Sequence, residues 1–183
     1  MTLLIIIAIV VVIVLWVISV QRTLVSKDEL CKNSFSQIGV QQASRWDALT
    51  ALAEMTKSYS EHEYKTLTDV IAQRRQITGA STPAEANAQE NLLTEAMTHI
   101  LAVGEQYPDL KANETYIKTM DSINTYENQV RMSRMVYNDA ATNFNRLVRQ
   151  FPNNLIAGML GFTPKEYLQE NKNGKDQMPS MKL

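Results

Sequence analysis

A continuous apolar run occupies the N-terminal end of the chain. Residues 3–20 read LLIIIAIVVVIVLWVISV and carry no formal charge. As a helix, this run would span about 27 Å, which is close to the hydrocarbon thickness of a bilayer. Because it is apolar on every side, a core helix of a soluble protein accounts for it poorly. The pattern therefore predicts an uncleaved transmembrane anchor over residues 1–21, from Leu3 to Val20, with Trp16 as an interfacial aromatic near its end.

The residues that flank this run disfavour two other kinds of N-terminal segment. A cleavable signal peptide has a basic leading region, a shorter apolar core and a small-residue cleavage site. Here only MT precedes the core, and SVQRTLV closes it. A lipoprotein requires small residues just before its cysteine, whereas Asp28, Glu29 and Leu30 precede Cys31. We therefore expect the anchor to remain on the protein.

Basic residues follow the anchor but do not precede it. Arg22, Lys27 and Lys32 lie within a few helical turns of its end. The positive-inside rule then places the N-terminus outside and the bulk of the chain in the cytoplasm. We expect a single-pass membrane protein with this orientation.

Behind the anchor, apolar and small side chains recur at helical spacing. Residues 22–78 contain one glycine and no proline, and their apolar stripe comprises Phe35, Ile38, Leu49, Leu52, Tyr59 and Val70. The sequence TGASTP at residues 78–83 predicts a break, because Ser81 and Thr82 suit a cap and Pro83 suits a first helical turn. A second helix is predicted over 84–104, ending at Gly104.

The stretch EQYPDLKANETY at residues 105–116 interrupts this helical pattern. Pro108 disfavours helical geometry at Tyr107 and cannot donate a hydrogen bond to the preceding turn. Asp109 is expected to cap the next helix, and Tyr107 and Leu110 are expected to pin the segment to neighbouring helices. We predict a corner that joins two antiparallel helices.

A long helix is predicted from about residue 111 to Phe151, where Pro152 follows. Its inner row recurs every seven residues, which predicts a left-handed supercoil against another helix. The row consists of Tyr116, Ile123, Val130, Tyr137, Phe144 and Phe151, and a companion row consists of Met120, Glu127, Arg134, Ala141 and Val148.

The apolar segment NNLIAGMLGFTP is then expected to pack on the bundle or touch the membrane surface. The sequence PKEYL predicts one helical turn, and the polar composition of residues 170–183 predicts a flexible tail.

Composition narrows the class of protein. Lysine and arginine number 18 and aspartate and glutamate 19, so no excess of positive charge points to nucleic acid. Six glycines and five prolines are few for this length, which favours long helices. The single cysteine excludes an intrachain disulfide.

These motifs together resemble the LemA family of bacterial membrane-anchored proteins. The similarity is strongest over residues 105–162, where the Tyr-Pro-Asp-Leu corner precedes YENQVRMSRMVYNDA and the FPNN end of the helix. Residues 35–63 are similar more loosely. The resemblance implies an all-α fold in which residues 22–169 form an antiparallel up-and-down four-helix bundle of long helices.

Two positions depart from the family pattern. Ser44 stands beside Arg45 where members usually carry a second basic residue, and Thr50 stands where they usually carry proline. That proline would divide residues 22–78 into two helices. Without it, the chain could run through as one kinked helix; we expect two helices and therefore four in the bundle.

Five polar residues interrupt the core-facing rows, namely Gln42, Arg45, Glu63, Glu127 and Arg134. A buried charge without a partner is strongly unfavourable, so each requires one. We predict that the two arginines pair with the two glutamates between helices and fix their register. A catalytic or ion-binding role for the same residues is the alternative.

Motifs for catalysis and cofactors are absent from the sequence. It contains no His-Glu-x-x-His, no Walker loop, no dinucleotide-binding glycine turn and no Gly-x-Ser-x-Gly. Its two histidines lack the Glu-x-x-His pattern of a di-iron bundle, so His62 is expected at the surface. Cys31 is expected to be an ordinary helix cysteine, with acylation as the alternative. We predict a protein that is not an enzyme and holds no cofactor or metal.

Two functions are compatible with these features. The resemblance implies envelope organisation or membrane shaping, because one branch of the family takes part in forming magnetosome membranes. The first hypothesis is therefore a self-assembling scaffold in the bacterial cell membrane, with the lipid bilayer and its own copies as partners. The alternative is a regulatory or ligand-binding module that docks a membrane enzyme or signalling partner.

Overall fold

The computed structural model describes residues 1–168, and its regular structure is entirely helical. This confirms the predicted all-α class for the described part of the chain. The elements are α1 (Thr2–Thr56), α2 (Glu61–Ile71), α3 (Pro83–Gln106), α4 (Pro108–Lys111), α5 (Glu114–Arg149) and α6 (Asn153–Met159). The predicted polar tail at 170–183 lies outside the described residues.

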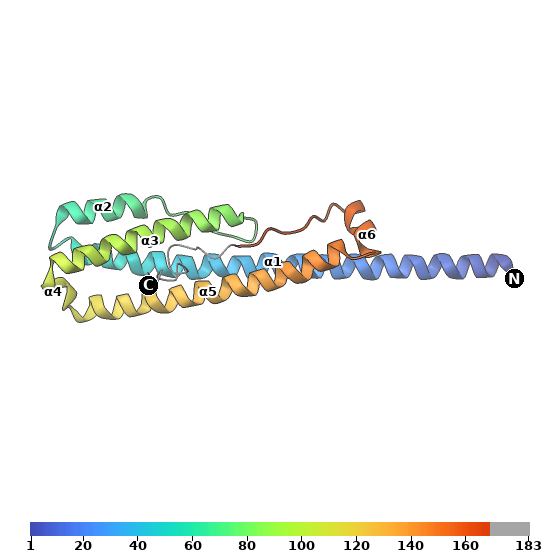
Figure 1. Ribbon diagram of the computed structural model, residues 1–183, viewed down its shortest axis with the longest axis horizontal. Coiled ribbons are helices and arrows are strands. Elements are labelled where there is room, and N and C mark those ends of the chain that lie inside the picture. Colours follow the sequence, from blue (N-terminus) through green and yellow to red (C-terminus); the bar gives the residue numbers. More distant parts are fainter. Residues whose placement is uncertain (169–183) are drawn as a thin grey trace, which may run out of the picture.

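Helix α1 is continuous from the apolar run into the core. Its 55 residues span about 80 Å, and its N-terminal part projects alone beyond the other helices (Figure 1). Side chains become buried at Val20, which is 8% exposed, and at Leu24, which is fully buried. The predicted boundary at residue 21 therefore marks a change in surroundings and not a break in the helix.

The bend after α1 lies further along the chain than the family pattern implies. Thr50 remains helical, and its hydroxyl donates to the carbonyl oxygen of Trp46 at 2.8 Å. The helix ends at Thr56, and the Ser60 hydroxyl begins α2 by accepting from the backbone N–H of Glu63 at 3.3 Å. Two helices are thus present in residues 22–78, but their division is at 57–60.

The expected bundle of four long helices is not confirmed. Helix α2 has only 11 residues, and residues 72–82 connect it to α3 without regular structure. The predicted cap of α3 is confirmed, because Thr82 and Glu85 form reciprocal hydrogen bonds around Pro83. Helix α3 continues past Gly104 to Gln106.

Helix α5 runs antiparallel along α1 and forms the main seam of the molecule (Figure 1). The rings of Phe35 and Tyr137 meet edge-on, with centroids 4.8 Å apart. The predicted inner row of α5 is buried at Tyr116, Ile123, Val130, Tyr137 and Phe144. Phe151 was predicted in the same row, and this is wrong: the helix ends at Arg149 and Phe151 is 76% exposed.

Different elements cover the two halves of the α1–α5 seam. Helices α2 and α3 cover the half farther from the apolar run, around a core that includes Trp46 and Ile100. Helix α6 and the extended residues 162–168 cover the half nearer to it, around Leu24 and Phe144 (Figure 1). The helical turn expected in PKEYL is therefore wrong, because these residues are extended.

A glycine allows the connection between α2 and α3 to cross α1 closely. A Cβ atom on Gly39 would lie 1.9 Å from the carbonyl oxygen of Ile77, which is far inside van der Waals contact. Ile77 is itself 6% exposed and belongs to the core. The missing side chain at Gly39 is what permits this approach.

We expect Gly39→Ala to destabilise the protein by about 1–3 kcal/mol, since backbone atoms must move to admit the methyl group. A helical Gly→Ala change would otherwise stabilise by up to about 1 kcal/mol. Gly158→Ala in α6 is the matched control, because no atom lies within 4 Å of the added Cβ. Urea unfolding of the full chain in detergent measures both; equal stability of the two variants would contradict this account.

Candidate functional site

A buried ion pair links α1, α3 and α5. The Arg45 side chain is 3% exposed and pairs with Glu90 of α3, and its Nη2 lies 4.0 Å from Glu127 Oε2 of α5. Gln42 adds a hydrogen bond from Nε2 to Glu90 Oε2 at 3.1 Å. Arg45 therefore lies between helices as predicted. Its nearer partner Glu90 was missed, although its spacing from Ala86 and Leu93 puts it beside the apolar row of α3.

Arg134 and Glu63, the other two predicted members, do not join the cluster around Arg45. Arg134 donates to the side-chain oxygen of Asn87 on α3 at 2.7 Å. Glu63 Oε2 of α2 instead lies 2.7 Å from His99 Nε2 of α3. His99 lies nine positions, or about 13 Å, beyond Glu90 on α3. The predicted arginine–glutamate pairing of Glu63 is therefore wrong, and polar contacts occur at several separate levels.

Part of the hydrogen-bonding capacity around Arg45 is unused within the described residues. Of the four buried side-chain atoms without a hydrogen-bond partner in this part of the chain, three belong to nearby residues of α1, namely Gln42 Oε1, Arg45 Nε and Trp46 Nε1, and the fourth is His99 Nε2. Burying such groups without partners costs free energy. Gln42 and Arg45 thus each have one buried polar atom without a partner among the described residues.

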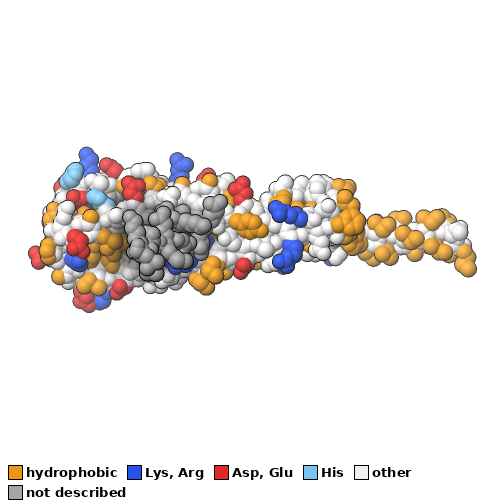
Figure 2. All heavy atoms as spheres, in the orientation of Figure 1, with side chains coloured by type: hydrophobic (Ala, Val, Ile, Leu, Met, Phe, Trp, Pro, Cys, Tyr) orange, Lys and Arg blue, Asp and Glu red, His pale blue; other side chains and the backbone are white. Residues whose placement is uncertain are grey.

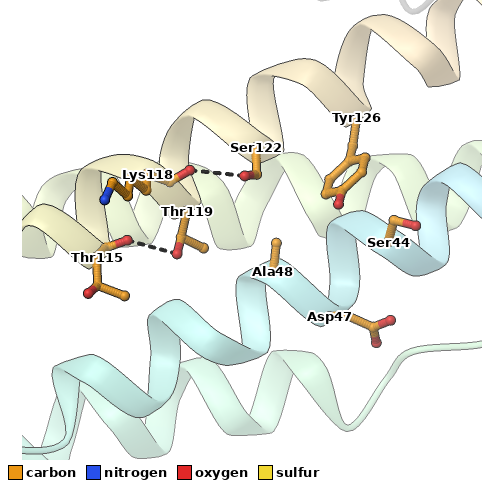
Figure 3. Close-up of a pocket in the computed structure, with 8 residues that line it drawn as sticks. All are labelled: Ser44, Asp47, Ala48, Thr115, Lys118, Thr119, Ser122 and Tyr126. Atoms are coloured by element: carbon orange, nitrogen blue, oxygen red, sulfur yellow. Dashed lines mark hydrogen bonds between the residues drawn. The ribbon is translucent and has the colours of Figure 1, made fainter.

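A shallow groove runs between α1 and α5 close to this cluster (Figure 3). Its volume is about 330 Å³, and it is lined by Ser44, Asp47, Ala48, Thr115, Lys118, Thr119, Ser122 and Tyr126. The hydroxyls of Thr119 and Ser122 donate to carbonyl oxygens of their own helix, at 2.8 and 3.0 Å. The protons of these two hydroxyls are therefore already engaged within α5.

The corner between α3 and α5 is placed as predicted, but its cap is a different residue. Tyr107 ends α3 and Pro108 begins α4, while Leu110 is 1% exposed and packs in the core. Asp109 lies within α4 and makes no capping hydrogen bond. Asn113 caps α5 instead, accepting from Thr115 N at 2.8 Å. The predicted capping role of Asp109 is wrong, because the short helix α4 moves the start of α5 along the chain.

Side chains of α5 hold the extended segment 162–168 through its backbone. Asn145 both donates to the carbonyl oxygen of Lys165 and accepts from its N–H, at 2.8 and 2.6 Å. Asn138 makes the same pair of bonds to Leu168, at 2.9 and 3.0 Å. Seven helical residues span about 10.5 Å and three extended residues about 10 Å, so the two spacings match. Residues 162–168 are thus held through their backbone, as a strand is held by its neighbour in a sheet.

An ion pair that the sequence analysis missed fastens the same segment to α1. Lys165 Nζ lies 2.6 Å from Asp28 Oδ1, and Lys32 Nζ lies 2.8 Å from Asp28 Oδ2. Burial raises the pKa of the Asp28 carboxyl, but the hydrogen bonds from the two lysines outweigh it and hold the pKa below its ordinary value. The helical spacing of Asp28 from the core residues Leu24 and Phe35 was the available signal.

The remaining candidates from the sequence are metal-ligating side chains, His62 and Cys31. Among residues 1–168, no group of three or more His, Cys, Asp or Glu side chains could hold a metal ion. His62 is exposed, as expected. Cys31 is 2% exposed, and burial raises the pKa of its thiol, which disfavours acylation there.

The N-terminal part of α1 is long and apolar enough to cross a membrane, and within the described residues it is the only helix that is. Leu3 is 68% exposed and Trp16 37% exposed, whereas Val20 is buried against the core. The apolar side chains thus face outward over residues 3–16, and burial against the core begins in the last turn of the predicted anchor. An apolar surface of this length requires an apolar environment.

We expect Arg45→Met to lower the free energy of unfolding by about 3–5 kcal/mol, because it leaves the Glu90 carboxylate without its charged partner. Adding Glu90→Gln should recover more than about 1 kcal/mol of that loss. The exposed pair Asp47–Arg74, 2.6 Å apart, is the control and should contribute little. Urea titrations of the full chain in detergent give all values; strictly additive losses at Arg45 and Glu90 would refute the coupling.

Acid should weaken the docking of residues 162–168. Because the folded pKa of Asp28 lies below its unfolded value of 3.8, its contribution is complete above that value and is lost as the pH falls through the folded pKa. We expect Asp28→Asn to lose less stability than the parent chain between about pH 6 and pH 3. Glu29→Gln serves as the control, since this carboxylate is 56% exposed. Identical pH profiles for Asp28→Asn and the parent would contradict the assignment.

Comparison with known proteins identifies relatives of this chain by sequence. The chain is 35% identical over 79 residues to magnetosome protein MamQ 2 of Paramagnetospirillum magneticum, covering 43% of this chain and 29% of that protein. It is 26% identical over 133 residues to protein LemA of Metamycoplasma hominis, covering 70% of this chain and 59% of that protein. The chain thus spans less than two thirds of the length of these relatives. The sequence profile of the LemA family matches residues 34–183, and the protein therefore belongs to the LemA family and is membrane-associated.

Proposed function

We propose that this protein is a membrane-anchored scaffold of the LemA type that assembles with its own copies and organises or shapes the bacterial cell membrane. The observation that carries the proposal is the continuity of α1. One unbroken helix of 55 residues contains both the apolar run and the main packing surface for α5. Movement or clustering of the anchor is therefore transmitted directly to the rest of the molecule.

An exposed apolar row on α5 supports self-assembly. Met132, Met135 and Val136 are 59%, 52% and 53% exposed, and Val40 of α1 is 54% exposed. Because Phe35 lies beside Tyr137 in the antiparallel seam, Val40 falls at about the level of Met132. Exposed apolar side chains gathered at one level favour a protein contact. Copies anchored in one bilayer project in the same direction, so these surfaces can meet side by side.

Within this proposal, the bundle is of the up-and-down type and consists of α1, α2, α3 and α5. Their chain directions alternate along the long axis of the molecule (Figure 1). The basic residues after the apolar run support a single pass with the bundle in the cytoplasm. The magnetosome proteins among the relatives support a role in membrane organisation. The proposed role is structural and requires no catalysis, cofactor or nucleic acid.

A regulatory or ligand-binding module is the second candidate. The groove between α1 and α5 and the unsatisfied polar atoms near Arg45 favour it. The Arg45→Met/Glu90→Gln variant separates the two functions. Unchanged capture of membrane partners by this variant, with altered melting, supports the scaffold, whereas lost capture by a well-folded variant supports the module.

We expect cysteine cross-linking in membranes to report the contact between copies. In a Cys31→Ala background, Met135→Cys should give disulfide-linked dimers on mild oxidation, because the α5 faces of neighbouring copies meet. Glu95→Cys on the exposed side of α3 is the control and should stay largely monomeric. Equal dimer yields at the two positions would show random collision, and absence of dimers at Met135→Cys would refute this interface.

A further inference from the structure

Helix α6 packs where α1 leaves the core. Ala157 is fully buried and Ile156 is partly buried, in the same core cluster as Val20 and Leu24. Figure 1 shows α6 against α1 just where the lone N-terminal part of that helix begins. The short helix therefore lies at the end of the bundle that faces the proposed bilayer.

The outward side of this helix and its flanks is apolar. Phe151 is 76% exposed, Leu155 57%, Met159 83% and Leu160 49%. Leu155 and Met159 are four residues apart and so lie on one side of α6. This is the reverse of a helix on a water-exposed surface, which buries its apolar side and exposes polar residues. On the face shown in Figure 2, apolar side chains form a rim at the base of the projecting helix.

The level of α6 along α1 corresponds to a membrane interface. Trp16 and Val20 mark the last turn of the apolar run, and Leu24 lies one turn, or about 6 Å, beyond Val20. Because α6 shares a core cluster with Val20 and Leu24 and lies against α1 where the lone N-terminal part begins (Figure 1), we place it close to the end of the hydrocarbon layer. Interfacial helices insert their apolar side at this depth, about 5–10 Å into the boundary between headgroups and acyl chains.

The segments next to the apolar run and around α6 carry only basic charges, and Asp28, which follows directly in the sequence, is paired with Lys32 and Lys165. Residues 1–27 and 140–162 contain four basic residues, Arg22, Lys27, Arg146 and Arg149, and no aspartate or glutamate. Both arginines of α5 are in its last turn and have exposed side chains. Figure 2 shows basic side chains close to the apolar rim. A basic ring beside an exposed apolar surface matches an anionic lipid surface, where each cation adds about 1 kcal/mol of attraction.

The geometry points to a second membrane contact, in which Phe151, Leu155, Met159 and Leu160 insert into the interface and the basic ring binds anionic headgroups. This inference rests on the proposed membrane anchoring and adds to it a lipid class and a binding surface. Because α6 packs against α1, a membrane contact at each of them fixes the rotation and tilt of α1 as well as its depth. The face of α5 proposed for self-assembly is then held at a constant orientation.

Spin labels measure the depth of this surface. Two full-length proteins are prepared in a Cys31→Ala background, one with a single nitroxide at Leu155→Cys and the other with one at Met159→Cys. Each is reconstituted into phosphatidylcholine vesicles that contain phosphatidylglycerol. We expect both labels to be more accessible to oxygen and less accessible to a water-soluble nickel complex than a label at Glu95→Cys. Labels at Leu155 and Met159 with the aqueous accessibility of the Glu95 label would overturn the inference.

Two arginine variants test whether the basic residues are needed for the contact with anionic lipid. Arg146→Gln/Arg149→Gln should shift the Leu155 label toward the aqueous values in phosphatidylglycerol vesicles, whereas Arg131→Gln, farther from the apolar rim on α5, should leave it in place. The same shift for both variants would overturn the role of the basic ring. Strong dipolar broadening at Leu155 together with low accessibility to both oxygen and the nickel complex would mean that a second copy covers α6, and this also overturns the inference.

Alkaline extraction of the same vesicles separates this inference from the proposed anchoring. A chain that stays in the vesicles but shows aqueous labels contradicts only the second contact. A chain that is released contradicts the anchoring itself and the inference with it. Circular dichroism of each labelled variant, compared with the parent chain, establishes that the helical fold is retained.

Discussion

The packing of α5 along the unbroken helix α1 is the interaction on which the other elements depend. Its apolar seam includes Leu24, Phe35 and Ile38 from α1, and Tyr137 and Phe144 from α5, all at most 5% exposed. Burying a side chain of this size is worth about 1.5–3 kcal/mol, so the seam provides much of the stabilisation. Two helices leave most of their sides open to water, however. The rest of the chain serves to cover the surface that this pair leaves exposed.

The two halves of the seam are covered by different means. Helices α2 and α3 cover the half far from the apolar run with regular side-chain packing, and there Arg45 and Glu90 bring charge into the core as a pair. An extended segment covers the near half, and its backbone needs hydrogen-bond partners that a helix would supply internally. Asn138 and Asn145 supply them, in the manner of a neighbouring strand. These two asparagines thus join an extended segment to a helix whose backbone cannot pair with it.

The ends of the molecule differ in chemistry as a result. The far end is closed by the corner at Pro108 and carries mixed surface charges, including the pair formed by Glu105 and Lys111. The near end combines the basic ring, the exposed residues of α6 and the apolar run of α1. A membrane protein that places its apolar and basic surfaces together at one end is oriented by the bilayer. This polarity gives a physical basis for a scaffold whose copies stand side by side.

Sequence alone determined the features that depend on neighbours along the chain. The apolar run, the heptad row of α5, the cap at Thr82 and the corner at Pro108 follow from periodicity and local backbone chemistry, and the family resemblance follows from the same motifs. Only the tertiary structure decided which distant groups meet. Glu90 and not Glu63 pairs with Arg45, and Lys165 reaches Asp28 from the opposite end of the chain. Such pairings depend on the register and rotation of packed helices, and a shift of one residue rotates a helix by about 100° and replaces every partner.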